Sequence, residues 1–166
     1  MTTSVWRVLT PEQIAVADVV AGKRRTNARA QGWTERNGAH AYNGDKLDIM
    51  GARGEMAVFV ELRPAVWHYF KRRVTDLPDF NSDIDAKTRP RVWHDLPLTD
   101  RGHADWKYIL VCAEQHPAYE IVGWAWGHEI MDAALIRQMG GFPAYCFPRS
   151  RLRDITTLLP IFGPRV

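Results

Sequence analysis

Two apolar segments separated by a short turn constrain the fold of this chain more than any other feature. Residues 107–113 read Lys-Tyr-Ile-Leu-Val-Cys-Ala, and residues 119–126 read Tyr-Glu-Ile-Val-Gly-Trp-Ala-Trp. Both segments are rich in β-branched and aromatic residues, and the turn-like residues 114–117 separate them, so we predict an antiparallel hairpin. The first segment is apolar almost throughout, which is typical of a strand that is buried on both faces.

Helices are predicted before the hairpin. A helix over residues 11–30 is expected because Thr10 is a favourable N-cap and proline at position 11 suits the first helical position. A second helix over residues 46–62 should end there, because residue 63 precedes a proline. The other expected elements are a loop over 32–44, a short helix over 64–72, a strand or edge segment over 93–98, a helix over 128–139, a strand over 144–147, and a final helix that Ser150 caps and that runs to Leu159.

The composition indicates one globular domain. The chain has 166 residues, of which 46% are hydrophobic and 25% are charged. This length suffices for one sizeable hydrophobic core and is short for two independently folded domains. It contains no apolar run of about 18 residues and no charged-then-apolar leader, so we expect no membrane partner and a cytoplasmic location. Cys112 and Cys146 lie in apolar segments without zinc-binding spacing, so a structural zinc ion is not expected.

An acidic segment lies between the second predicted helix and the hairpin. Residues 78–88 read Pro-Asp-Phe-Asn-Ser-Asp-Ile-Asp-Ala-Lys-Thr. On an extended strand Asp83, Asp85 and Lys87 would point to the same side, because side chains alternate between faces. Carboxylates held close together repel one another, and a hard divalent cation such as Mg2+ relieves that repulsion. The alternative interpretation is a solvent-facing edge strand with ordinary surface charges, and only the surrounding sequence can decide between the two.

That surrounding sequence resembles a known family. Pro78-Asp79 followed by Asp85-Ala86-Lys87 resembles the signature of the PD-(D/E)xK nuclease superfamily, whose members share the restriction-endonuclease-like fold. A helix with the pattern Gly-x-x-Gly-Glu-x-Ala-Val commonly precedes the signature in that family, and residues 51–58 match this pattern. The hairpin and closing segment of small phage-type members correspond here to residues 107–112, 119–124 and 144–148, so the resemblance runs from about Gly51 to Leu159.

The resemblance implies an α/β fold with a restriction-endonuclease-like core. Such a core is a mixed central β-sheet flanked by helices, and here it would carry an N-terminal helical extension. We expect a single domain over residues 1–166, with the extension and its loop over residues 1–44 and the nuclease-like core over residues 45–159.

The resemblance also implies a metal-dependent nuclease that hydrolyses phosphodiester bonds. Asp79 or Asp83 would be the first family aspartate, and it would coordinate one Mg2+ or Mn2+ ion together with Asp85. Glu55 would complete the site or hold a second ion, and Lys87 would orient or help to deprotonate the attacking water. We expect a phage or prophage protein that acts as an endonuclease on DNA in the cytoplasm of a bacterial host. Nucleases of this framework often act as dimers to cut two strands, so a homodimer is one of the states that we consider.

Basic residues cluster on both sides of the acidic segment. The net charge of +3 says little by itself, but clustered cations beside an acidic notch are what cleavage of a polyanion requires. The residues expected to contact nucleic acid are Lys23, Arg24, Arg25, Arg29, Arg89 and Arg91. Each cluster can also be interpreted as a solvated helix face.

A second functional hypothesis keeps the fold and omits the chemistry. The chain would then be a catalytically silent nucleic-acid-binding or phage accessory protein, because a fold does not fix a function. A residue of a competent type occupies every family position of this chain, whereas a degenerate member is expected to have lost at least one. The sequence therefore favours the nuclease.

Overall fold

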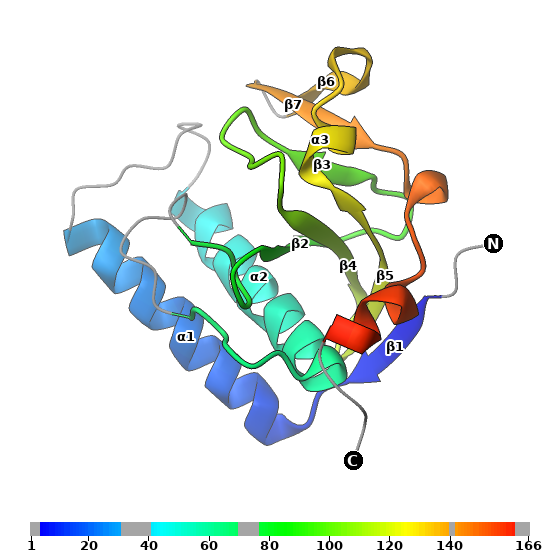
Figure 1. Cartoon of the computed structure of the whole chain (residues 1–166). Coiled ribbons are helices and arrows are strands. Elements are labelled where there is room, and N and C mark those ends of the chain that lie inside the picture. The colour runs from blue at the N-terminus through cyan, green and yellow to red at the C-terminus, as the bar shows by residue number, and fades with distance from the viewer. Residues whose placement is uncertain (1–3, 31–40, 70–76, 140–141, 162–166) are drawn as a thin grey trace.

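A mixed four-stranded sheet forms the centre of the molecule (Figure 1). The computed structural model describes residues 4–30, 41–69, 77–139 and 142–161. The strands follow the order β1 (Val5–Val8), β5 (Ala118–Trp126), β4 (Lys107–Gln115) and β2 (Ile84–Arg89). β2 and β4 run parallel, and the other neighbours run antiparallel. The predictions of an α/β protein and of a mixed sheet flanked by helices are confirmed.

The predicted hairpin is formed by β4 and β5, and β4 is buried on both faces. Ile109 and Val111 of β4 belong to a core beneath the helices, whereas Tyr108 and Leu110 belong to a second core on the opposite face. This alternation follows from the pleat of the strand. The continuous apolar run of residues 107–113 therefore predicted a central strand correctly.

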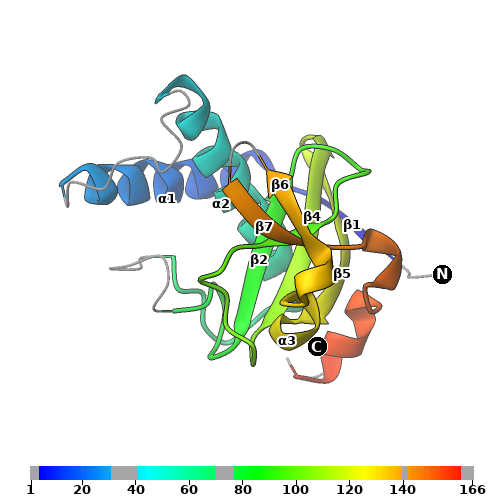
Figure 2. The same cartoon turned by 90° about the horizontal axis from the view of Figure 1, so that it is seen from above.

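Helices α1 (Pro11–Ala30) and α2 (Ala41–Leu62) pack together on one face of this sheet, as the view from above shows (Figure 2). α1 has its predicted bounds, and its N-terminus is capped as expected. The Gln13 backbone N–H donates to Thr10 Oγ1 at 3.3 Å, and the Thr10 N–H donates to Gln13 Oε1 at 2.9 Å. α2 begins five residues before the predicted helix, so the expected loop is wrong for residues 41–44, and the expected boundary at residue 44 falls inside α2.

A second layer covers the opposite face of the central sheet. It consists of an antiparallel sheet in the order β3 (Leu96–Leu98), β7 (Phe142–Phe147) and β6 (Ile136–Met139), and of the short helix α3 (Gly127–Ile130). Leu96, Phe147 and Ile130 from this layer are buried against Tyr108 and Leu110 of β4. The strands predicted near residues 93–98 and 144–147 are thus present, at slightly different bounds.

The predicted helix over residues 128–139 is wrong. Only α3 is an α-helix there, followed by the 3-10 turn η1 (Ala133–Leu135) and then by β6. The Asp132 side chain accepts a hydrogen bond from the Ala134 N–H at 2.9 Å and starts the 3-10 turn. Pairing of residues 136–139 with β7 then outweighs their local helix preference.

The predicted final helix is also wrong. The segment contains two 3-10 elements, η2 (Arg149–Arg151) and η3 (Ile155–Ile161), and Ser150 lies inside the first of them instead of capping a helix. Between them Arg153 forms a β-bridge with Trp124 of β5 through two backbone hydrogen bonds, which interrupts any continuous helix.

Two further differences concern short segments. Residues 64–69 are not helical, because the chain there bridges back to Phe80 through Trp67, and residues 70–72 of that predicted helix lie outside the described part. β1 is absent from the predicted elements. Its four residues are too few for an alternation pattern, and their pairing with β5 holds them in place.

Candidate active site

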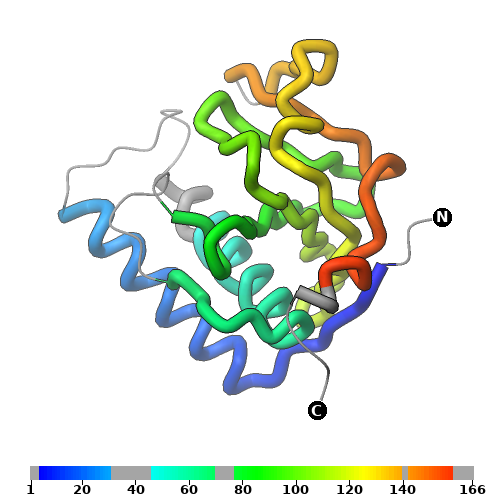
Figure 3. Tube along the Cα trace, in the orientation of Figure 1, coloured from blue at the N-terminus to red at the C-terminus, as the bar shows by residue number. Residues whose placement is uncertain are grey.

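Three buried carboxylates and one lysine meet where α2 approaches β2. Glu55 lies on α2, Asp79 lies in the segment before β2, and Asp85 and Lys87 lie on β2. The three acids are 6%, 4% and 5% exposed, respectively. The segment before β2 can be followed past α2 in the chain trace (Figure 3), and the charge of Asp79 in this segment acts on Glu55. Four residues that are up to 32 positions apart in the sequence therefore share one site.

A close contact between α2 and β2 positions Glu55. A Cβ atom at Gly54 would lie only 1.9 Å from Thr88 Oγ1, so glycine at this position is what allows the helix to approach the strand. At Gly51, one turn earlier on the same helix, an added Cβ meets nothing within 4 Å. The Gly54-Glu55 pair thus combines a close backbone approach with a side chain directed at the site.

A tight turn before β2 positions Asp79. Asn81 has a positive φ of 49°, and Phe80 bridges to Ile84 across the turn. The Ala86 N–H then donates to Asp79 Oδ2 at 2.8 Å. The short interval between Asp79 and Asp85 is therefore spanned by a turn that returns the chain alongside itself.

Lys87 forms an ion pair with Asp85 two residues earlier on β2. Burial alone would lower the pKa of the Lys87 ammonium, but the charges of Asp85 and Asp79 outweigh burial and raise this pKa above its ordinary value. The Lys87 side chain also lies 5.7 Å from the centroid of the Tyr108 ring. Lys87 is thus a cation held over a pair of buried acids.

Asp83 does not join the other acids. It lies in the turn before β2, so strand alternation does not apply to it, and its side chain forms an ion pair with Lys107 of β4. The Lys107 N–H also donates to the Asp83 carbonyl at 2.7 Å, and the Lys107 ammonium lies 4.4 Å from the Trp126 ring centroid. Of the two candidates for the first aspartate, Asp79 is the one that the structure places beside Asp85 and Glu55.

Two residues that the sequence interpretation did not place in the site hold Glu55. Arg24 of α1 donates from Nη1 to Glu55 Oε1 at 2.6 Å and from Nη2 to Oε2 at 2.7 Å. Trp67 Nε1 donates to the same Oε2 at 2.9 Å. Even so, burial and the charge of Asp79 outweigh these donors and raise the pKa of Glu55. No local motif marks this contact, because Arg24 and Trp67 reach Glu55 only through the packing of α1 and the segment after α2.

The oxygen donors of the site suit Mg2+ or Mn2+. Asp79 and Asp85 carry hard carboxylate oxygens, and Mg2+ in proteins commonly uses one or two carboxylates and keeps its other positions for water and phosphate. Within the ranges that the structure describes, no group of three or more His, Cys, Asp or Glu side chains is arranged as a metal cage. The two carboxylates Asp79 and Asp85 match, in number and in donor type, the protein ligands that Mg2+ commonly uses.

The basic residues predicted to contact nucleic acid occupy different settings on α1. Arg24 binds Glu55 in the acidic site, and Arg25 lies 3.9 Å from Asp48. Arg29 is exposed in the last turn of the helix. The expected cluster is therefore divided between the site and the surface.

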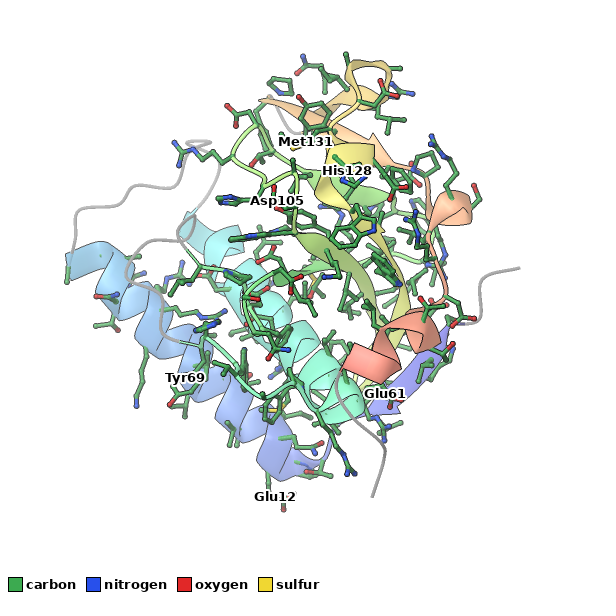
Figure 4. The ribbon with its side chains drawn as sticks, in the orientation of Figure 1. Glu12, Glu61, Tyr69, Asp105, His128 and Met131 are labelled. Atoms are coloured by element: carbon green, nitrogen blue, oxygen red, sulfur yellow. The ribbon has the colours of Figure 1, made fainter. Side chains whose placement is uncertain are left out.

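Lys23 borders a hollow of about 560 Å3 beside α1. Val16, Val19, Trp67 and Tyr69 also line this hollow, and Tyr69 lies against α1 in Figure 4. Trp67 belongs both to the hollow and to the set of residues that hold Glu55.

Arg89 and Arg91 follow the site along the chain. Arg89 lies two residues after Lys87 on the same face of β2, its Nε is buried without a hydrogen-bond partner, and burial lowers its pKa. Arg91 is exposed, lies 3.5 Å from Glu114, and lies 5.7 Å from the centroid of the Trp93 ring. The face of β2 that carries Asp85 and Lys87 thus continues into a cationic surface.

Comparisons of this chain with protein-family models, with curated proteins and with solved structures found no match. Among the described residues, no helix combines the length and the apolar character that crossing a membrane requires.

Proposed function

We propose that this protein is a metal-dependent nuclease of the PD-(D/E)xK type, with a restriction-endonuclease-like core, and that it hydrolyses phosphodiester bonds of DNA. The observation that supports this proposal is the meeting of Glu55, Asp79, Asp85 and Lys87 from separate elements at one point. These are the residues that the sequence resemblance designates, and chance surface charges would not be buried together in this way.

The chemistry follows from the residues of the site. Asp79 and Asp85 would hold a Mg2+ or Mn2+ ion, which when bound supplies positive charge to the phosphate and lowers the pKa of water. The hydrogen bond from the Ala86 N–H fixes the Asp79 carboxylate in position. Lys87 orients the attacking water and stabilises the negative charge that develops on the phosphate, because its ammonium is held beside Asp85 by the ion pair.

Contacts to the nucleic acid are assigned to cations near the site. Arg89 has no hydrogen bond at its buried Nε, and a phosphate would supply the anion that burial of a guanidinium calls for. Exposed Arg91 and the 66% exposed Trp93 beside it extend the same surface. The proposal includes action as a phage-type endonuclease in the cytoplasm of a bacterial host, which rests on the family resemblance.

Incubation of the purified protein with supercoiled duplex DNA and with circular single-stranded DNA tests this function. We expect cleavage with Mg2+ or Mn2+ that stops in EDTA and is lost in Asp85→Asn. Cleavage of circles would identify an endonuclease, because circles have no ends. Intact circular and linear substrates, with DNA binding that Asp85→Asn leaves unchanged, would support the catalytically silent module instead.

A further inference from the structure

The Glu55 carboxylate already accepts three hydrogen bonds from protein donors. Both of its oxygens accept N–H groups of Arg24, at 2.6 and 2.7 Å, and Oε2 also accepts from Trp67 Nε1 at 2.9 Å. A bidentate guanidinium–carboxylate pair is among the stronger interactions that proteins form. A metal ion at Glu55 would have to compete with a guanidinium that already holds both carboxylate oxygens.

Arg24 is fixed from more than one side. Its Nε donates to the Tyr69 carbonyl at 2.8 Å, while its two terminal nitrogens hold Glu55. The charges of Asp79 and Asp85 also act on Arg24, in addition to that of Glu55. The guanidinium therefore binds the Glu55 carboxylate directly and adds its positive charge to the field of Asp79 and Asp85.

The formal charges of the cluster point the same way. The three carboxylates and the two cations Arg24 and Lys87 leave one negative charge. Without nucleic acid, one divalent ion would bring the group to +1 and a second would bring it to +3, and a bound phosphodiester would neutralise the one-ion state. Arg24 cannot lose its charge by deprotonation in a protein, so this balance does not change with ordinary pH.

We propose that Arg24 takes the place of a second divalent cation, so that the site binds one metal ion per chain and Glu55 positions Arg24 instead of binding metal. This inference rests on the proposed nuclease function and adds to it the number of ions and the role of α1. Trp67 then has a positioning role. Its indole N–H orients the Glu55 carboxylate, which in turn orients Arg24.

The test is a count of bound Mn2+ ions by electron paramagnetic resonance at pH 8, with the purified full chain and without nucleic acid. We expect one ion for the wild-type protein and one for Glu55→Gln. The affinity of Glu55→Gln for Mn2+ should be about tenfold lower, as is typical when a residue that supports the metal ligands without binding the ion is changed. Arg24→Ala should bind two ions, because the Glu55 carboxylate is then open to metal. As a second readout, the wild-type cleavage rate should depend on Mg2+ with a Hill coefficient near one.

Arg53→Ala is the matched control for loss of a bridge between the two helices. Arg53 of α2 donates to both oxygens of Asp18 on α1, at 2.7 Å each, away from the acidic cluster. This variant should bind one ion, and far-ultraviolet circular dichroism should show that all variants fold.

The outcomes separate this inference from the proposed function. Two ions in the wild-type protein with one in Glu55→Gln, or one ion in Arg24→Ala, would overturn the role of Arg24 and leave the nuclease assignment standing. No bound ion in the wild-type protein, together with no metal-dependent cleavage, would overturn both.

Discussion

Two aspartate–lysine pairs lie at the start of β2, and they are built in opposite ways. In the pair Asp85–Lys87 the acid is buried, with 7% of its side chain exposed, and the lysine is 35% exposed. In the pair Asp83–Lys107 the acid is 32% exposed and the lysine is buried at 9%. The first pair therefore presents a cation above a buried acid, and the second presents an acid above a buried cation.

The surroundings of the two pairs explain this difference. Lys107 is buried against the Trp126 ring, so its pair with Asp83 ties the turn before β2 to the neighbouring strand β4. Asp85 shares its environment with Asp79 and Arg24, and the Lys87 side chain paired with it is partly exposed. We infer that an accessible cation over buried acids can engage a phosphate and a metal ion, whereas the second pair is a structural clamp.

The largest effect is expected when the pair Asp85–Lys87 is broken. Lys87→Ala should lower the rate of DNA cleavage by about 10²- to 10³-fold, because it removes one preorganised charge-stabilising group while Asp79 and Asp85 remain. Single-turnover cleavage assays with saturating protein measure this rate. A Lys87→Ala variant that cleaves within a few-fold of the wild-type rate would contradict the role of the first pair.

Gly54→Ala should displace β2, the strand that carries the first pair, without changing either member of the pair. The added methyl group would clash with Thr88 of β2, so we expect a loss of about 1–3 kcal/mol in the free energy of unfolding, together with reduced cleavage. Gly51→Ala, on the same helix with open space around it, should stabilise the protein by about 0.5–1 kcal/mol and leave cleavage intact. Urea denaturation measures both changes, and equal effects of the two substitutions would argue against a close contact between α2 and β2.

Breaking the second pair should affect stability and not chemistry. Asp83→Asn should lower the free energy of unfolding by about 1–2 kcal/mol, because a buried lysine loses its carboxylate partner. Its cleavage rate should stay near that of the wild-type protein. Asp105→Asn, at an exposed position of the neighbouring loop, serves as the control and should change stability by less than about 0.5 kcal/mol. If Asp83→Asn abolished cleavage instead, the first aspartate of the site would have to be reassigned.

The smallest effect is expected at Arg89, which continues the face of β2 that carries the first pair. Arg89→Ala should weaken DNA binding and reduce the slope of the logarithm of the binding constant against the logarithm of salt concentration by about one. Fluorescence anisotropy in EDTA measures binding without cleavage. The exposed loop variant Arg101→Ala is the control, and an unchanged slope in Arg89→Ala would exclude Arg89 from the phosphate contacts.

The sequence predicted the parts of the fold that depend on local pattern. The apolar hairpin of residues 107–126 and the capped helix over residues 11–30 were recognisable because burial and capping leave periodic signals. Residues 136–139 were mistaken for helix because pairing with β7 makes them a strand, and the local sequence does not reveal that tertiary contact. β1 was missed for the same reason.

The candidate site was predictable in part. Glu55, Asp85 and Lys87 follow a spacing that the sequence displays, but the choice between Asp79 and Asp83 depended on the turn at Asn81. Arg24 lies 31 residues before Glu55 and reaches it only because α1 packs against α2. Sequence alone marked Arg24 as one of several basic residues of a helix, not as part of the acidic cluster.

Cleavage of supercoiled DNA in Mn2+ by Lys87→Ala and Asp83→Asn, measured side by side with the wild-type protein and with EDTA controls, tests the central claim most directly. The account predicts metal-dependent cleavage that Asp83→Asn retains and that Lys87→Ala loses by at least about 10²-fold. Cleavage that is absent from the wild-type protein, or that the two variants retain equally, would contradict it.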